Sequence, residues 1–198
     1  ALTRKVREHG TLLAIFGPIK RENELKKRLE SMQPPDREDL VGKVTMKKAV
    51  ILNPGARDEE GNLLPRLAVL DCGIKYNILR ELCIRFEVVW CPANLPFKDI
   101  MSDWKPSALF ASNGPGDPAH PDSATNARNT LAEAVREGLP VMGICLGHQL
   151  MGLAAGLRTY KLRYGHRGAN QPVLDLHSNK VHITSQNHGF AVEDPAKG

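Results

Sequence analysis

The residues best suited to chemistry surround Cys145, in the segment Gly143-Ile144-Cys145-Leu146-Gly147. The apolar run before this segment predicts a strand, and the spacing after it predicts a helix. Glycines two positions to either side of the cysteine are typical of a nucleophile elbow, a turn too sharp for side chains beside the nucleophile. The first amides and the dipole of the helix favour the thiolate, and the N–H of Leu146 is expected to face a developing oxyanion. We therefore expect Cys145 to be a nucleophile.

The other cysteines, Cys72, Cys83 and Cys91, lie in apolar runs and are expected to pack in the core. The four cysteines show no CxxC or metal-ligand spacing, and a chain of 198 residues does not need disulfide staples. A reducing, cytoplasmic setting is the simplest interpretation. His177 and His182 are five residues apart with no third ligand nearby, so we expect no metal site.

A second candidate segment is the loop Ser112-Asn113-Gly114-Pro115-Gly116-Asp117-Pro118, which follows the apolar run 107–111. Ligands of parallel α/β sheets bind where strands end, so this loop could supply a second oxyanion donor opposite Cys145. By itself the pattern is equally consistent with a rigid turn. It does not match a phosphate-binding loop, because no GK[ST] follows.

The elements that must hold these loops alternate between strand and helix after Pro65. This order predicts a mostly parallel sheet with helices on both faces. The expected strands are 67–72, 87–93, 107–113 and 139–144, and the expected helices are 76–86, 97–104, 123–138 and 146–156. Shorter β-like runs follow at 159–165, 171–176, 180–186 and 189–193.

The N-terminal part has a different character. Residues 2–9 predict the end of a helix stopped by Gly10, residues 11–17 a short strand, and residues 21–32 a charged helix. The segment 49–65 contains Pro, Gly and charged residues and is typical of a linker. We therefore divide the chain into an N-terminal unit (1–48), a linker (49–65) and a main domain (66–198).

The net charge of +5 does not point to nucleic acid. Residues 1–48 hold 12 Lys/Arg and 7 Asp/Glu, whereas the rest of the chain holds 15 of each. The basic stretch contains a single aromatic residue, Phe16, and therefore offers no stacking platform for bases. No apolar run approaches the roughly 20 residues that span a bilayer, and the first residues lack a signal-peptide pattern. We expect neither nucleic acid nor membrane as a partner.

Four motifs occur in one order: SNGPGDP (112–118), GICLGHQ (143–149), GHRGANQPV (165–173) and SQNHGFAV (185–192). The second is similar to the nucleophile motif of class I glutamine amidotransferases. The set resembles the small-subunit family of carbamoyl phosphate synthetases, or the equivalent domain of fused pyrimidine-pathway enzymes. The resemblance covers residues 66–193, and it extends to residues 2–13, which resemble the end of that family's N-terminal domain. It implies a flavodoxin-like α/β domain preceded by a remnant of a smaller domain.

The resemblance also implies roles. Cys145 would attack the side-chain amide of L-glutamine and form a γ-glutamyl thioester, while the amides of Gly114 and Leu146 would bind the oxyanion. The substrate would be held by Gly114, Gly116, Leu146, Gln149, Asn187, Gly189 and Phe190. The ammonia would pass to a synthetase large subunit or fused synthetase domain, for carbamoyl phosphate used in pyrimidine or arginine synthesis. ATP and Mg²⁺ are expected only on that partner, and no cofactor on this chain.

One feature of the family is missing from the sequence. Its catalytic His and Glu lie in an H-P-E motif after the QNHGFAV stretch, and the 198 residues contain no H-P-E. His120, His148 and His188 are expected to have structural rather than catalytic roles, and His166 carries no signal. We therefore expect this chain alone to be inactive or very weak, with the base lying in a longer native chain. The alternative is a non-catalytic module that binds glutamine or the synthetase.

Overall fold

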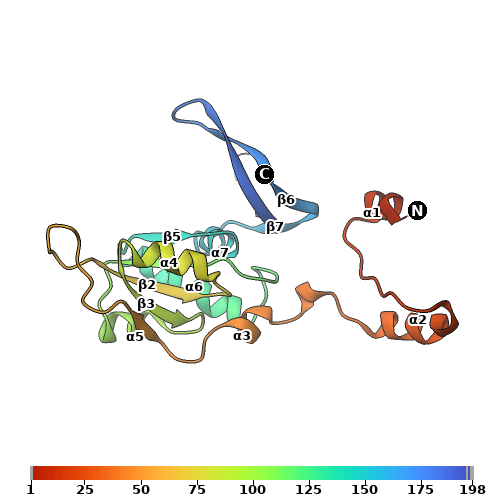
Figure 1. Ribbon diagram of the computed structural model, residues 1–198, viewed down its shortest axis with the longest axis horizontal. Helices are drawn as coiled ribbons and strands as arrows, with labels where there is room; N and C mark the ends of the chain where they lie inside the picture. Colours follow the sequence, from red (N-terminus) through yellow and green to blue (C-terminus); the bar gives the residue numbers. More distant parts are fainter. Residues whose placement is uncertain (1, 195, 197–198) are drawn as a thin grey trace.

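The computed structural model describes residues 2–194 and 196, and its centre is a five-stranded sheet in the order β1-β3-β2-β4-β5 (Figure 1). The strands are β1 (Val50–Leu52), β2 (Arg66–Asp71), β3 (Glu87–Pro92), β4 (Ala108–Ala111) and β5 (Val141–Gly143). β2 pairs in parallel with β3 and β4, β4 pairs in parallel with β5, and β1 runs antiparallel to β3. The predicted mostly parallel sheet is confirmed.

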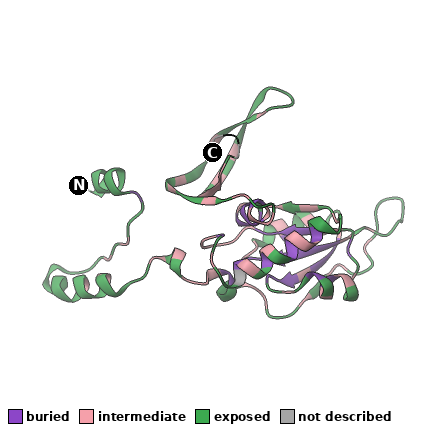
Figure 2. Ribbon diagram, turned by 180° about the vertical axis from the view of Figure 1, so that it is seen from behind, coloured by how far each residue is buried: buried purple, intermediate pink, exposed green. Residues whose placement is uncertain are grey.

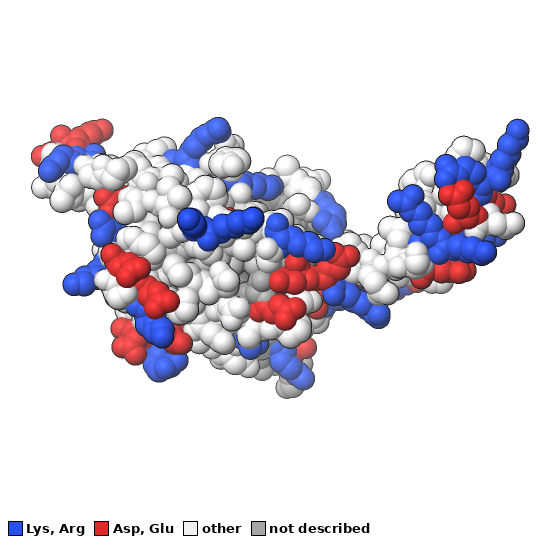
Figure 3. Space-filling model, turned by 90° about the horizontal axis from the view of Figure 1, so that it is seen from below, with Lys and Arg blue, Asp and Glu red and all other residues white. Residues whose placement is uncertain are grey.

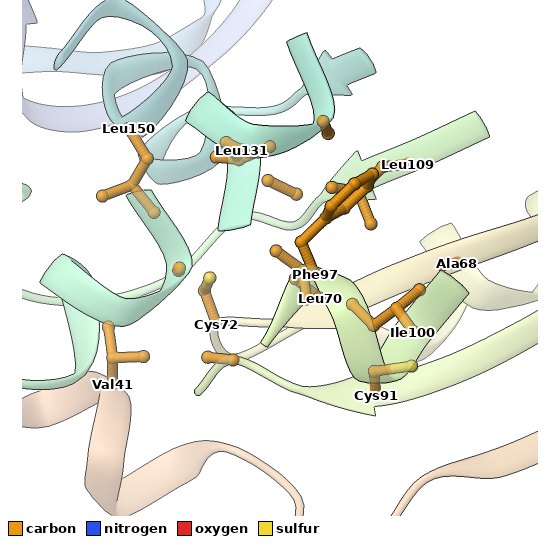
Figure 4. Close-up of a cluster of buried hydrophobic side chains, with 14 of the residues drawn as sticks. Val41, Ala68, Leu70, Cys72, Cys91, Phe97, Ile100, Leu109, Leu131 and Leu150 are labelled. Carbon is orange, nitrogen blue, oxygen red and sulfur yellow. The ribbon is translucent and has the colours of Figure 1, made fainter. Parts of the chain in front are cut away.

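Helices cover both faces of this sheet, because alternate residues of each buried strand point to opposite sides. Leu67 and Val69 of β2 pack on one side with Leu79 of α4 (Tyr76–Cys83). Their neighbours Ala68 and Leu70 pack on the other side, with three helices. These are α5 (Phe97–Asp103), α6 (Ser123–Arg136) and α7 (Leu146–Ala154). Figure 4 shows this larger cluster, and Figure 2 shows the buried strands between the helices.

A long antiparallel hairpin follows α7 and extends from the body of the molecule (Figure 1). Its strands are β6 (Thr159–Asp175) and β7 (Lys180–Val192). The four β-like runs predicted here are therefore parts of two strands. The pairing of β6 with β7 shifts register between Lys161 and His166 and between Gly168 and Gln171. These shifts interrupt the alternation of apolar and polar residues in the sequence, but the strand continues through them.

The N-terminal arm, residues 2–39, carries α1 (Leu2–His9), η1 (Ile19–Arg21), α2 (Glu22–Ser31) and η2 (Pro35–Arg37). α1 ends at Gly10 as predicted, in the left-handed conformation with φ of 82°. The strand predicted at residues 11–17 is wrong, because no segment in the described part of the chain pairs with this run. Acidic and basic side chains are mixed on the arm (Figure 3).

The division at residues 49–65 stays a prediction, but two segments before residue 66 contact the main sheet. β1 lies within the expected linker and pairs with β3. Val41 of α3 (Leu40–Val44) is 3% exposed and belongs to the larger core cluster. The packing of the main domain therefore includes residues from Val41 onward. None of the described helices is long and apolar enough to cross a membrane.

Candidate active site

Cys145 occupies a sharp turn between β5 and α7, with φ of 54° and ψ of −108°. A left-handed φ is uncommon for a residue with a Cβ and marks a strained backbone. A Cβ on Gly143 would lie 2.4 Å from the carbonyl carbon of Gly147, and one on Gly147 would lie 2.1 Å from the oxygen of Ala111. Neither position has room for a side chain. The nucleophile-elbow geometry expected from the sequence is therefore present.

Two backbone amides are directed at the thiol. The backbone N–H groups of Leu146 and Gly114 lie close enough to the Cys145 thiol to lower its pKa. Leu146 is the first residue of α7, and Gly114 lies in the loop after β4, which β4–β5 pairing brings beside the elbow. A Cβ on Gly114 would lie 2.1 Å from the oxygen of Cys72, so only glycine allows this approach. An oxyanion formed next to Sγ would have two donors within reach.

Burial has the larger effect on the acidity of this thiol. It raises the pKa of Cys145 above the ordinary value of 9.0, although the amides of Leu146 and Gly114 and the charge of Lys75 act to lower it. The sequence led us to expect that the helix amides would favour the thiolate. The amides lower the pKa of the thiol, as expected, but burial raises it by more. At neutral pH the thiol form predominates, so a proton acceptor must take part in any attack by Cys145.

This acidity gives a first prediction. Only the thiolate reacts with iodoacetamide, so the rate of Cys145 alkylation should keep rising as the pH passes 9.0. Buried Cys72 and Cys91, whose thiol pKa values burial raises to about 12, should not react in the folded protein. Peptide mass spectrometry between about pH 6 and about pH 10 measures the four rates separately. A Cys145 rate that levels off below about pH 8 would contradict the structure.

The thiol opens into a cavity of about 680 Å³. Apart from Leu146, which contributes its amide, every residue predicted to bind or react lines this cavity: Gly114, Gly116, Cys145, Gln149, Asn187, Gly189 and Phe190. One wall was not predicted, because it comes from residues 11–13 and 34–36 of the N-terminal arm. The arm contacts the hairpin through an ion pair of 2.6 Å between Lys161 and Asp36. That ion pair lowers the pKa of the Asp36 carboxyl.

Gln149 connects the elbow helix to the hairpin. The residue is 5% exposed, and its Nε2 donates to the carbonyl oxygen of Phe190 over 2.7 Å. The carbonyl oxygen of Asn187 lies 3.7 Å from Sγ of Cys145, and the Asn187 side chain accepts a hydrogen bond of 2.6 Å from Arg167. These contacts fix the 187–190 segment beside the nucleophile. The sequence did not single out Arg167.

Two histidines meet on the hairpin. The rings of His166 and His188 are in contact, with 3.2 Å between Nδ1 of His166 and Nε2 of His188. Nδ1 of His188 donates to the oxygen of Phe190 over 2.7 Å. Both nitrogens of His188 are thus engaged, which fits the structural role expected for it. His166 was missed, because only the ladder register shows that it faces His188.

The remaining candidates lie elsewhere. His148 is exposed on α7, and His120 contacts Asp122 in its own loop. Cys72 and Cys91 are fully buried, and Cys83 packs at the edge of the smaller core cluster, as predicted. Across residues 2–194 and 196, no group of three or more His, Cys, Asp and Glu side chains could hold a metal ion.

This chain is similar to known glutamine amidotransferases and to carbamoyl phosphate synthase small chains. The family model "Glutamine amidotransferase class-I" matches residues 68–198. The carbamoyl phosphate synthase small chain of Methanococcus maripaludis is 42% identical over 201 residues, covering 98% of this chain and 52% of that protein. The corresponding protein of Thermotoga maritima is 39% identical over 200 residues, covering 100% of this chain and 48% of its own length. The chain thus spans about half the length of the curated relatives it matches.

Solved structures support the fold. The crystal structure of SMU.1228c superposes with a TM-score of 0.54 and 20% identity, over 67% of this chain and 64% of that one. A Thermoplasma acidophilum protein named as part of a GMP synthase superposes with a TM-score of 0.52 and 18% identity, over 65% and 67% of the two chains. At these identities the likeness concerns the α/β fold alone.

Proposed function

We propose that this chain is the glutamine-hydrolysing part of a carbamoyl phosphate synthase. The chain belongs to the class-I glutamine amidotransferase family. The observation that carries the proposal is the arrangement around Cys145. A cysteine on a strained elbow, with two backbone amides directed at its sulfur, is suited to attack a carbonyl carbon and bind the resulting oxyanion. The small-chain relatives from two organisms support the choice of synthase.

The reaction follows from these groups. The sulfur of Cys145 forms a bond to the side-chain carbonyl carbon of L-glutamine, and the carbonyl oxygen takes the electron pair and is bound by the Gly114 and Leu146 amides. When the carbonyl re-forms, the C–N bond breaks, and the nitrogen leaves as ammonia with the former thiol proton. Water then cleaves the γ-glutamyl thioester to glutamate and restores the thiol. His188 is not assigned as the proton carrier, because both its ring nitrogens are engaged.

The cavity would hold the rest of the substrate. Gly116 presents backbone without a side chain, and Asn187, Gly189 and Phe190 line the opposite wall. Gln149 would act on glutamine through the Phe190 carbonyl that it holds. The ammonia would be consumed by a synthetase large subunit or a fused synthetase domain, which would also bind ATP and Mg²⁺. No cofactor is proposed for this chain.

Covalent labelling tests the proposal. In a diazoketone analogue of L-glutamine, a diazomethyl group replaces the amide nitrogen. The Cys145 sulfur adds to the ketone carbon, whose oxygen becomes an oxyanion bound by the two amides, and the thiol proton passes to the diazomethyl carbon. The sulfur then moves to that carbon as N₂ leaves, and the ketone re-forms. We expect a single adduct on Cys145, with labelling slowed by L-glutamine. A non-catalytic module would bind glutamine, but its Cys145 would react with the diazoketone no faster than a simple alkyl thiol does. Labelling of Cys145 at that slow rate would overturn the proposal.

Gln149→Glu should weaken glutamine binding. The two side chains have the same shape, but a carboxylate cannot donate to the Phe190 carbonyl and would face it with like charge. We expect the glutamine concentration that protects half of Cys145 from iodoacetamide to rise at least about 10-fold, which corresponds to the cost of an unmet buried hydrogen bond. The matched control is Gln186→Glu, since the Gln186 amide bonds Thr184 on the same hairpin and does not line the cavity. Equal protection in the two variants would contradict the assignment.

A further inference from the structure

Ser112 is a buried hydroxyl two residues before the oxyanion-binding amide, and the mechanism above does not use it. It follows the last residue of β4 and is 0% exposed. Its Oγ accepts a hydrogen bond of 2.9 Å from the N–H of Cys72 and donates one of 2.8 Å to the carbonyl oxygen of Asn113. The hydroxyl therefore ties the end of β2 to the peptide that joins Asn113 to Gly114.

That peptide carries one of the two oxyanion donors. The described chain contains no cis peptide bond, so the Asn113 carbonyl and the Gly114 N–H lie in one plane and point in opposite directions. Because the Ser112 hydroxyl holds the carbonyl on one side, the N–H is turned to the other side, toward the cavity that Gly114 lines together with Cys145. There it helps to lower the pKa of the thiol. The direction of the Gly114 donor is thus fixed by a side chain that does not touch the thiol.

The main chain of Ser112 contacts the second donor's helix. Its carbonyl oxygen accepts a 3.0 Å hydrogen bond from the N–H of Gly147, in the first turn of α7. Leu146, which supplies the other amide, directly precedes Gly147. Ser112 therefore joins β2, the loop and α7 at the point where the two donors converge on Cys145.

We propose that Ser112 is a positioning residue for the oxyanion-binding site, acting by fixing the orientation of the Asn113–Gly114 peptide. The catalytic role of Ser112 rests on the proposed function, whereas its effect on the direction of the Gly114 N–H does not. Gly114 and Leu146 touch the reacting oxygen, while Ser112 determines whether one of them points at it.

The test compares Ser112→Ala with Thr130→Val. Thr130 is also a buried hydroxyl, 3% exposed, whose Oγ1 donates to a backbone carbonyl at 2.9 Å, but it lies on α6 and does not line the cavity. In Ser112→Ala we expect diazoketone labelling to slow about 10-fold, less than the 100-fold or more that loss of a donor causes. The high-pH rate with iodoacetamide, which needs no oxyanion donor, should stay within about 2-fold of wild type. Thr130→Val should change neither rate.

A second readout does not require glutamine chemistry. The Gly114 N–H helps to lower the Cys145 pKa, so a misdirected N–H should move the iodoacetamide inflection of Ser112→Ala to higher pH, with Thr130→Val unchanged. The positioning role would be overturned if Ser112→Ala slowed diazoketone labelling and iodoacetamide alkylation equally. It would also be overturned if the ratio of the diazoketone rate to the iodoacetamide rate were the same in Ser112→Ala and Thr130→Val. If wild type is not labelled by the diazoketone, the proposed function fails, and the inflection still decides whether Ser112 directs the amide.

Discussion

Cys145→Ser should abolish glutamine hydrolysis, lowering the rate by at least about 10³-fold. A hydroxyl is a far weaker nucleophile than a thiol and would need stronger activation by a base. The substitution keeps the elbow and both amides, so it removes the sulfur with little change of shape. Glutamate release is the direct measurement.

The control for this prediction is Cys83→Ser, since Cys83 is the other partly exposed thiol among the described residues. It packs beside the smaller core cluster on the far side of the sheet from α7. Its substitution should leave labelling and hydrolysis unchanged. Hydrolysis at the wild-type rate in Cys145→Ser would rule out a thioester mechanism.

Gly114→Ala should have the second-largest effect, a fall in labelling and hydrolysis of about 10²-fold or more. The added methyl would lie 2.1 Å from the Cys72 oxygen and 2.7 Å from Cδ2 of Leu146. Since the first contact is with backbone, the loop must move away, and its N–H must leave the thiol. The fall should appear mainly in the rate of the chemical step, since the oxyanion exists only there.

The matched control is Gly17→Ala. Its new methyl would lie 2.7 Å from Cδ1 of Leu25, the far end of a flexible side chain that can rotate away. Gly17 does not line the cavity, so labelling should proceed at the wild-type rate. If Gly114→Ala were equally active, the loop after β4 would not supply an oxyanion donor.

The sequence predicted the structure correctly where an element depends mainly on neighbouring residues in the chain. Apolar runs such as 67–72 became buried strands, and the glycines around Cys145 predicted an elbow whose crowding the structure displays. Patterns failed where the outcome depends on a distant partner. Residues 11–17 have a strand-like composition but no strand beside them, and the arm that contains them contributes a cavity wall. The His166–His188 contact likewise depends on a register with two irregularities.

The thiol acidity illustrates the same limit. The amides that follow Cys145 are visible in the sequence as a helix start, and their effect on the pKa has the expected direction. The opposing effect comes from burial by residues distributed over the loop, the helix and the hairpin. Desolvation is a property of the assembled site, so it could not be predicted from the elbow motif.

A γ-glutamyl thioester on Cys145 is the central claim, and trapping that species tests it most directly. The chain would be mixed with L-glutamine, quenched in acid within the first turnover, digested and analysed by mass spectrometry. We predict that the peptide containing Cys145 gains the mass of a γ-glutamyl group in place of the thiol hydrogen, and that Cys145→Ser does not. Glutamate release without any such adduct, or an adduct on another residue, would contradict it.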